Sequence, residues 1–200
     1  MYRIYFIMKD NWNLRIDTSP PFAYITNFLS KEECQNLINI GKKKGLFKAK
    51  VGVHKGVLNK KLRKSSTVFL YPSDGLIDIF KKLTDAVTSL NNQFYNFHIF
   101  SFNEGLQLTH YKAPGEKYGK HVDRAMNSNV RKLSISIQLS DPNSYKGGDL
   151  CLYESDDPIY TPREQGTLIM FPSFALHEVT PVSKGERFSL VAWVTGDPLK

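Results

Sequence analysis

Residues 133–140 read Leu-Ser-Ile-Ser-Ile-Gln-Leu-Ser, a strict alternation of apolar and polar side chains. Because successive side chains of a β-strand point to opposite faces, this pattern places four aliphatic side chains on one face of a strand. Short strand-like runs separated by turns recur from residue 94 onward, and the last of them spans residues 187–195. Such recurrence predicts a sandwich or barrel of about seven or eight strands.

Turn residues and one buried strand divide the second half of the chain. Residues 167–171 form a continuous apolar run, which is typical of a strand that is covered on both faces. The sequence Asp141-Pro142-Asn143 ends the alternating strand, and Gly147-Gly148 introduces a further strand over residues 149–153. The chain after residue 94 is therefore expected to consist mainly of strands.

Two helices are expected before residue 93. Ser30 and Glu33 have the spacing of a capping box, in which the two side chains bind otherwise unpaired backbone amides, and Gly45 is the expected stop. A second helix is predicted over residues 74–92, where apolar side chains recur at helical spacing. Its apolar stripe consists of Leu76, Ile79, Phe80, Leu83, Ala86, Val87 and Leu90. We expect a single domain, with residues 1–93 as helical support and a basic loop and residues 94–196 as the strand-rich core.

Charge and cysteine content restrict the class of protein further. The chain of 200 residues has 27 Lys and Arg against 19 Asp and Glu, a formal charge of +8 that favours acidic partners without defining a fold. Its only cysteines, Cys34 and Cys151, exclude a disulfide framework and are expected to be buried, reduced thiols. No stretch of eighteen apolar residues is present, so the sequence predicts no membrane span and a cytoplasmic location. The basic stretch comprises Lys55, Lys60, Lys61, Arg63 and Lys64 and fits a solvated loop.

One of the five histidines has a carboxylate two positions later, in the sequence His121-Val122-Asp123. In an extended backbone, residues i and i+2 share a face, so an imidazole nitrogen and a carboxylate oxygen can converge on one metal ion. His177 is the best candidate for a third ligand, because it follows a turn that ends the buried strand at 167–171. Of the other histidines, His54 falls in the basic stretch, His98 is expected to be a hydrogen-bonded core residue, and His110 stays open as a ligand.

The last strand carries an unusual charge on one face. Period-2 alternation places Arg187, Ser189 and Trp193 on the same side of residues 187–195. A buried guanidinium needs an anionic partner, since leaving it unpaired is costly. That partner is either the carboxylate of a ligand, which the guanidinium fork can bind through two hydrogen bonds, or an acid of the protein itself such as Asp149 or Glu186.

Taken together, His121-x-Asp123, His177 and Arg187-x-Ser189 resemble the iron(II)- and 2-oxoglutarate-dependent dioxygenases, and within them the prolyl 4-hydroxylase branch with its bacterial and viral relatives. Supporting motifs are Tyr111-x-x-x-Gly115-x-x-Tyr118, Gly147-Gly148-Asp149, Gly166-Thr167, Gly185-x-Arg187 and Trp193. The resemblance covers roughly residues 100–195 strongly and the helical part more loosely. It implies a mainly β fold, with a double-stranded β-helix (jelly roll, cupin-like) core and the N-terminal helices packed on one sheet.

The same resemblance implies a set of roles. His121, Asp123 and His177 would bind Fe(II), and Arg187, Ser189 and Tyr111 would bind 2-oxoglutarate. Dioxygen would be the second co-substrate and ascorbate a further cofactor, with succinate, CO₂ and a hydroxylated C–H bond as products. By the family's pattern the substrate is a proline in a peptide or protein. Substrate contacts would come from Tyr118, Trp193 and Arg63, although core packing also explains the two aromatic residues.

Other functions stay open at this point. A nucleic-acid demethylase of the same superfamily would suit the positive charge, but that branch typically has a second arginine six residues after the first, and here Trp193 occupies that position. We therefore do not expect a nucleic-acid partner. A cupin-like metal-binding module without oxygen chemistry would not need Arg187 and Ser189. Hydroxylation of a free amino acid, or of a lysyl or asparaginyl side chain, depends on loops that the sequence does not place. The target protein, the ring position and the oligomeric state are left open.

Overall fold

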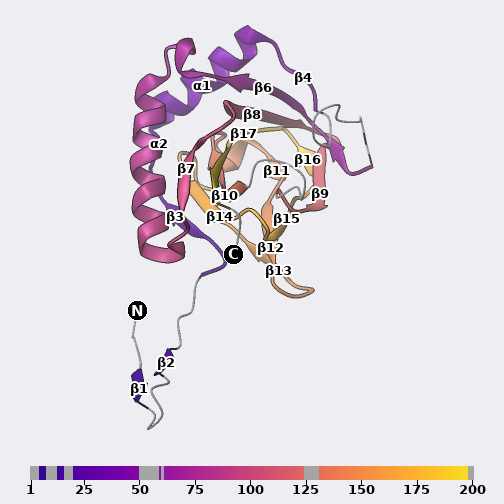
Figure 1. The fold of residues 1–200 in the computed structure, drawn as a ribbon. Coiled ribbons are helices and arrows are strands. Elements are labelled where there is room, and N and C mark those ends of the chain that lie inside the picture. Colours follow the sequence, from indigo (N-terminus) through magenta and orange to yellow (C-terminus); the bar gives the residue numbers. More distant parts are fainter. Residues whose placement is uncertain are drawn as a thin grey trace.

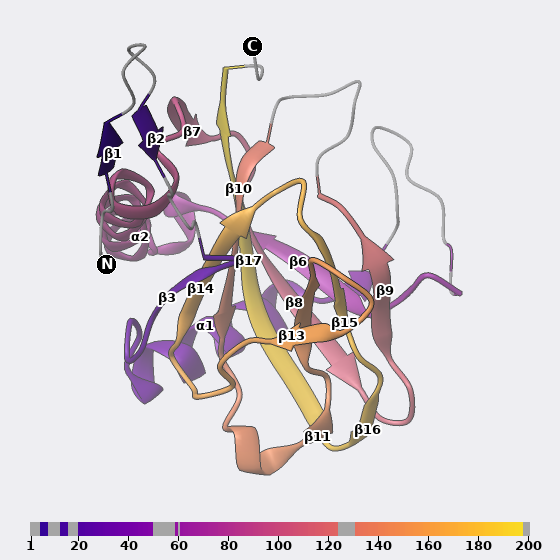
Figure 2. The ribbon, with the colours of Figure 1, turned by 90° about the horizontal axis from the view of Figure 1, so that it is seen from below.

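The computed structural model describes residues 5–7, 13–15, 20–49, 59, 61–123 and 131–197. Its main body is a pair of facing antiparallel sheets, with α1 (Lys31–Lys44) and α2 (Ile77–Leu90) packed against the larger sheet (Figures 1 and 2). This is the jelly-roll core with helices on one sheet that the sequence predicted. The described residues include no helix that is both long and apolar enough to cross a membrane.

The larger sheet has eight strands and forms the wall next to the helices. In order across the sheet these are β3 (Ala23–Ile25), β14 (Leu168–Pro172), β10 (Arg131–Gln138), β17 (Glu186–Gly196), β8 (Leu106–Lys112), β6 (Ser66–Leu70) and β4 (Phe47–Lys48), and β7 (Ile99–Phe102) also pairs with β17. Strands β3, β4 and β6 come from the first 93 residues. That part of the chain therefore adds strands to the sheet as well as helices.

The smaller sheet has five strands and faces the larger one across the barrel (Figure 2). Its order is β13 (Pro158–Tyr160), β12 (Leu150–Tyr153), β15 (Leu176–Val179), β9 (Lys117–His121) and β5 (Arg63–Lys64). Two further pairs are β1 (Tyr5–Ile7) with β2 (Asn13–Arg15), and β11 (Lys146–Gly147) with β16 (Val182–Lys184). After residue 94 the described chain has eleven strands, β7 to β17, rather than seven or eight. The extra ones have only two or three residues, too few for a period-2 pattern to be recognised.

The alternating strand β10 separates two environments. Its aliphatic side chains Leu133, Ile135 and Ile137 are at most 1% exposed and pack in the core shared with the helices. Its polar side chains Ser134 and Ser136 face the barrel interior, where they line a pocket. The predicted alternation is therefore confirmed, and it gives the barrel a polar interior wall on this strand.

The first helix begins and ends as predicted. The Ser30 hydroxyl accepts from the Glu33 amide at 3.1 Å, the Glu33 carboxylate accepts from the Ser30 amide at 2.6 Å, and Gly45 follows with φ of 87°. The second helix was predicted to begin at Asp74, but that residue ends a 3₁₀ turn (Pro72–Asp74) and α2 begins at Ile77. Gly75, with φ of 79°, adopts a left-handed conformation that interrupts the helix.

Candidate functional site

Three predicted ligand residues meet at one end of the smaller sheet. His121 ends β9, and the β9–β15 register places His177 directly opposite it. Asp123 follows His121 and lies between the two rings, with Oδ1 at 3.6 Å from His121 Nε2 and Oδ2 at 3.5 Å from His177 Nε2. All three ligand atoms lie within 4.8 Å of one another. One metal ion can therefore contact all three.

Both histidines present the same ring nitrogen to the centre of this cluster. His121 Nδ1 is 2.8 Å from the Gly119 carbonyl oxygen, and His177 Nδ1 is 2.9 Å from the Ala175 carbonyl oxygen. A backbone carbonyl can only accept, so each Nδ1 carries the proton and each Nε2 keeps its lone pair for a metal. Backbone contacts of this kind are the usual way in which proteins orient metal-binding imidazoles.

The charges of the cluster also suit a metal. Burial by itself would raise the pKa of Asp123, but its interactions with His121 and His177, which act when those rings are protonated, outweigh burial and hold this pKa well below the usual range. Burial lowers the pKa of His177 and outweighs the opposing attraction of Asp123. An ionised carboxylate and neutral imidazoles are the donor set that non-haem Fe(II) takes, with further positions left open.

Hydroxyl groups that sequence reasoning missed hold the carboxylate in place. Ser134 Oγ donates to Asp123 Oδ2 at 2.8 Å and is 2.9 Å from Ser173 Oγ. The Asp123 amide donates to the Ser173 carbonyl at 2.9 Å. Ser134 belongs to the polar face of the alternating strand, so its inward direction was predictable, but its partner was not.

Arg131 is a second missed residue and contacts the backbone of the same aspartate. Its Nη1 donates to the Asp123 carbonyl at 3.3 Å, and its Nε donates to Glu104 Oε1 at 3.0 Å. The guanidinium carbon lies 3.9 Å from the centre of the Trp193 ring. Nothing in the local sequence distinguishes Arg131 from an ordinary basic residue at the start of a strand.

The structure shows which groups form hydrogen bonds with the Arg187 guanidinium. This side chain is 1% exposed, and its hydrogen bonds go to neutral atoms, from Nη2 to Gln138 Oε1 at 2.8 Å and from Nη1 to Ser189 Oγ at 3.3 Å. Its Nε has no partner among the described residues. Of the acids considered, Asp149 pairs with Arg163, and Glu186 lies 3.5 Å from Lys112. Arg187 is thus a buried cation without an anionic partner among the described residues, and such a charge is costly to bury.

The predicted Gly-Gly turn makes room for this arginine. Gly148 has φ of 66°, and a Cβ atom at this position would lie 3.0 Å from Arg187 Cδ and 2.9 Å from Val182 Cγ2. Both the backbone conformation and the close approach therefore require glycine.

The remaining predicted residues line the same pocket as the ligand cluster. Tyr111, 3% exposed, lies opposite Arg187 in the β8–β17 register, with its ring centre 5.6 Å from the guanidinium carbon. The lining also includes Ser189, Trp193, Tyr118 and Arg63. The structure thus brings together residues that are more than a hundred positions apart in the chain.

Tyr118 and Arg63 form one side of the pocket. The Tyr118 ring stacks on His121 with the ring centres 3.5 Å apart, and the Arg63 guanidinium carbon lies 4.5 Å from the Tyr118 ring centre. Burial raises the pKa of Tyr118 to about 12, so its hydroxyl stays neutral at physiological pH. Arg63 donates to Gln107 Oε1 at 2.7 Å and to Ser65 Oγ at 3.0 Å.

The other two described histidines, His98 and His110, take no part in the cluster. The prediction that His98 is a core residue was wrong: its side chain is 73% exposed and its Nδ1 is 2.6 Å from Asp197 Oδ2. The reason is that β7 pairs only with the far end of β17, so this part of the chain stays at the surface. His110 stacks on Phe188 with ring centres 4.2 Å apart, on the opposite face of β8 from Tyr111. His54 lies outside the described residues, as does most of the basic stretch.

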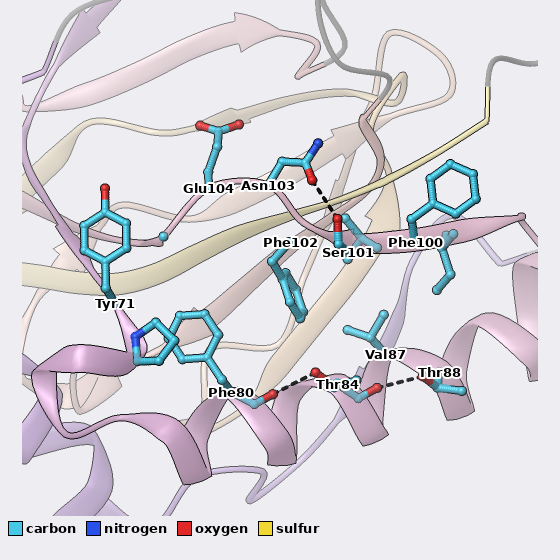
Figure 3. Close-up of a pocket in the computed structure, with 14 residues that line it drawn as sticks. Tyr71, Phe80, Thr84, Val87, Thr88, Phe100, Ser101, Phe102, Asn103 and Glu104 are labelled. Carbon is cyan, nitrogen blue, oxygen red and sulfur yellow. Dashed lines mark hydrogen bonds between the residues drawn. The ribbon is translucent and has the colours of Figure 1, made fainter.

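A second hollow lies between α2 and β7 and contains none of the three ligand residues (Figure 3). Its wall includes the aromatic side chains of Tyr71, Phe80, Phe100 and Phe102. Its only carboxylate is that of Glu104, which is already paired with Arg131. This hollow has no group that would perform chemistry.

Comparison with known families agrees with this arrangement. Residues 106–195 match the model of the 2OG-Fe(II) oxygenase superfamily. The matched segment contains the His-Asp-His cluster and Arg187. This part of the chain is therefore similar to a 2OG-Fe(II) oxygenase domain.

The chain is also similar to curated hydroxylases in sequence and to solved prolyl hydroxylases in fold. A PKHD-type hydroxylase of Prochlorococcus marinus (strain MIT 9303) is 43% identical over 81 residues, 40% of this chain and 37% of the relative. The chain thus matches little more than a third of that relative's length. The fold resembles a Trichoplax adhaerens prolyl hydroxylase in complex with a hypoxia inducible factor peptide fragment (TM-score 0.73, 18% identity, 88% of this chain and 84% of that chain). It also resembles a Pseudomonas putida prolyl-4-hydroxylase (TM-score 0.71, 20% identity, covering 89% of this chain and 94% of that chain).

Proposed function

We propose that this chain is an Fe(II)- and 2-oxoglutarate-dependent hydroxylase that acts on proline in a peptide or protein. One observation carries the proposal: the His-Asp-His cluster shares its pocket with Tyr111 and Ser189, and both of these contact the buried Arg187, which has no acidic partner in the described part of the chain. A metal-binding module without oxygen chemistry has no use for such an arginine. An enzyme that binds a dicarboxylic acid beside its metal needs both the metal ligands and the arginine.

Different residues would bind the metal, the co-substrate and the substrate. His121 and His177 would hold iron through their Nε2 atoms, and Asp123 through its carboxylate. Arg187 would bind the distal carboxylate of 2-oxoglutarate, with hydroxyl groups of Ser189 and Tyr111 as further donors. When bound, iron and 2-oxoglutarate would supply the oxygen activation: 2-oxoglutarate would lose CO₂ and take one oxygen atom of dioxygen to become succinate, and the other oxygen atom would convert a C–H bond of the substrate to C–OH.

Proline is the substrate best supported by the relatives and by the pocket. The Trichoplax and Pseudomonas structures are named as prolyl hydroxylases, and the first contains a peptide. In this chain, Tyr118 and Trp193 supply flat aromatic walls in the pocket that contains the ligand cluster. We propose that they enclose a proline ring and keep water from the reacting centre, with Arg63 at the edge of the same pocket.

Two further features belong to the proposal. We include ascorbate as a cofactor that sustains turnover, in line with the family resemblance. We also propose a cytoplasmic location, supported by Cys34 and Cys151, which are both buried as free thiols and need no oxidising compartment.

The test is release of succinate from 2-oxoglutarate by the purified chain with Fe(II) and ascorbate. Proline-containing peptides are expected to stimulate this release and to gain the mass of one oxygen atom on the proline. The same peptides with proline replaced by alanine serve as controls. Stimulation by a methylated oligonucleotide, or by free amino acids but not by peptides, would contradict the proposed substrate and leave the reaction class intact.

Acidification is expected to weaken metal binding. Because burial holds the pKa of His177 below its usual value of 6.5 and Asp123 stays ionised to still lower pH, these two ligands remain deprotonated at neutral pH. Protons should therefore compete with the metal only in the acidic range, below about pH 6.5. Titration with Co²⁺ or Mn²⁺ from pH 8 to pH 5 measures this. An affinity that rises as the pH falls would contradict the assignment of His177 as a ligand.

A further inference from the structure

Basic side chains gather at one edge of the smaller sheet, on β5, on β9 and just before β5. They are Lys61, Arg63, Lys64, Lys117 and Lys120, and we call them the cationic edge. Strand β5 pairs with β9 through Arg63↔Tyr118 and Lys64↔Lys117, which brings all of these residues together. None of them forms an ion pair with a described acid; the ion pairs of the described chain use other lysines and arginines. The edge therefore presents uncompensated positive charge.

One residue of the cationic edge, Arg63, lines the pocket, and Lys64 and Lys117 lie beside it on the other face of the same edge. Arg63 lines the pocket together with the metal-binding residues, and its hydrogen bonds go only to the neutral side chains of Ser65 and Gln107. Lys120 immediately precedes His121 in β9, and its Nζ lies 3.8 Å from the centre of the Tyr153 ring. Strand β9 lies on the side of the barrel away from α2, so the helices do not cover this edge (Figures 1 and 2).

The opposite side of the same sheet has the opposite charge. Glu154, Asp156 and Asp157 are exposed in the turn between β12 and β13, and none of them pairs with a described basic residue. This turn lies at the metal end of the sheet, because Tyr153 pairs with Leu176 and Leu152 with His177. Across the five strands from β5 to β13, about 19 Å at the usual strand spacing, the charge changes from basic to acidic.

We propose that the substrate is a peptide segment with acidic side chains on one flank of the hydroxylated proline, and that the cationic edge binds this flank. The inference rests on the proposed prolyl hydroxylation and adds the substrate's charge and its orientation across the sheet. With the proline between Tyr118 and Trp193, a neighbouring carboxylate lies within reach of the Arg63 guanidinium, whose described partners are all neutral. The acidic β12–β13 turn repels the other flank if that flank is also acidic. A nucleic acid is disfavoured for the same reason, since its backbone is negative along its whole length.

Peptide binding tests this without depending on turnover. Fluorescent peptides with one central proline, flanked on one side by aspartate, asparagine or lysine, are titrated against the full chain loaded with Mn²⁺ and 2-oxoglutarate without oxygen. The aspartate peptide is expected to bind on the order of tenfold more tightly than the asparagine peptide, and the lysine peptide more weakly than both, since several partly exposed ion pairs add to about that factor. At about 1 M salt, where the Debye length is about 3 Å, the three affinities should converge.

Two double Lys→Glu variants test whether the cationic edge causes the preference for the aspartate peptide. In the double variant Lys64→Glu/Lys117→Glu, the preference should reverse in favour of the lysine peptide. Lys146→Glu/Lys184→Glu is the control, because these exposed lysines also face each other across a short antiparallel pair, at β11–β16, and have no described acidic partner. The control should keep the preference for aspartate. Equal effects of both double variants, or no preference in the unmodified chain, would overturn the inference.

Two other outcomes separate this inference from the proposed function. Binding of a single-stranded oligonucleotide that competes with the aspartate peptide and is lost in Lys64→Glu/Lys117→Glu would assign the edge to nucleic acid and overturn the peptide assignment. Tight, charge-selective binding without any hydroxylation of the proline under oxygen would support the cationic edge and contradict prolyl hydroxylation.

Discussion

Replacing Arg187 by methionine is expected to weaken 2-oxoglutarate binding by about a hundredfold, while iron stays bound. Hydrogen bonds to a charged group contribute about 1.5–3 kcal/mol each, and the fork of a guanidinium offers two to a carboxylate. Loss of about 3 kcal/mol corresponds to a factor of about a hundred in the dissociation constant. Calorimetric titration of the iron- or manganese-loaded chain with 2-oxoglutarate measures the change.

The same variant should not be less stable in the absence of 2-oxoglutarate. Arg187 is 1% exposed and bonds only neutral groups, so its charge is buried at a cost that no protein anion offsets. Replacement of buried charges by apolar side chains of similar volume is often neutral or stabilising. We expect the thermal midpoint of the ligand-free protein to be unchanged or higher, and the shift on adding 2-oxoglutarate to be lost.

A variant of Ser189 shows how much of the 2-oxoglutarate affinity depends on the neighbour of Arg187 rather than on Arg187 itself. Ser189→Ala removes one hydroxyl partner and should weaken 2-oxoglutarate binding by only about fivefold, since a typical single hydrogen bond contributes about 1 kcal/mol. A methionine variant that binds 2-oxoglutarate as tightly as the unmodified chain would show that Arg187 is not the anchor.

Replacing Asp123 by alanine is expected to abolish specific metal binding and, with it, turnover. Asp123 supplies the only negative charge of the cluster, and its oxygens lie at 3.6 and 3.5 Å from the two imidazole Nε2 atoms. Two neutral imidazoles alone leave the charge of the metal unbalanced in a buried site. Metal content after dialysis and the visible spectrum of the Co²⁺-loaded protein measure the loss.

Ser134→Ala is the matched partial variant for this experiment. It keeps all three ligands and removes the 2.8 Å hydrogen bond to Asp123 Oδ2. Loss of such a supporting contact typically lowers metal affinity by 10- to 100-fold, so weaker but saturable binding is expected. Retention of one tightly bound metal per chain in Asp123→Ala would contradict the site.

Local sequence patterns predicted much of this fold. The alternation at 133–140 predicted the buried face of β10, the apolar run at 167–171 predicted β14, and Ser30 with Glu33 predicted the start of α1. These predictions succeed because hydrogen bonding within a helix and the alternation of a strand depend on near neighbours in the chain. The short strands β11, β13 and β16 escaped prediction because pairing with distant strands, rather than their own composition, stabilises them.

Local sequence spacing alone showed which side chains could act together along one extended segment: His121 with Asp123 at the end of β9, and Arg187 with Ser189 and Trp193 on β17. Three further contacts became visible in the folded chain: His177 lies opposite His121, Ser134, Ser173 and Arg131 bind Asp123, and Gln138 rather than an acid bonds Arg187. The physical reason is that i and i+2 geometry is a property of the extended backbone, whereas contacts between strands depend on register. Register is set by the packing of the whole barrel and has no local signature in the chain.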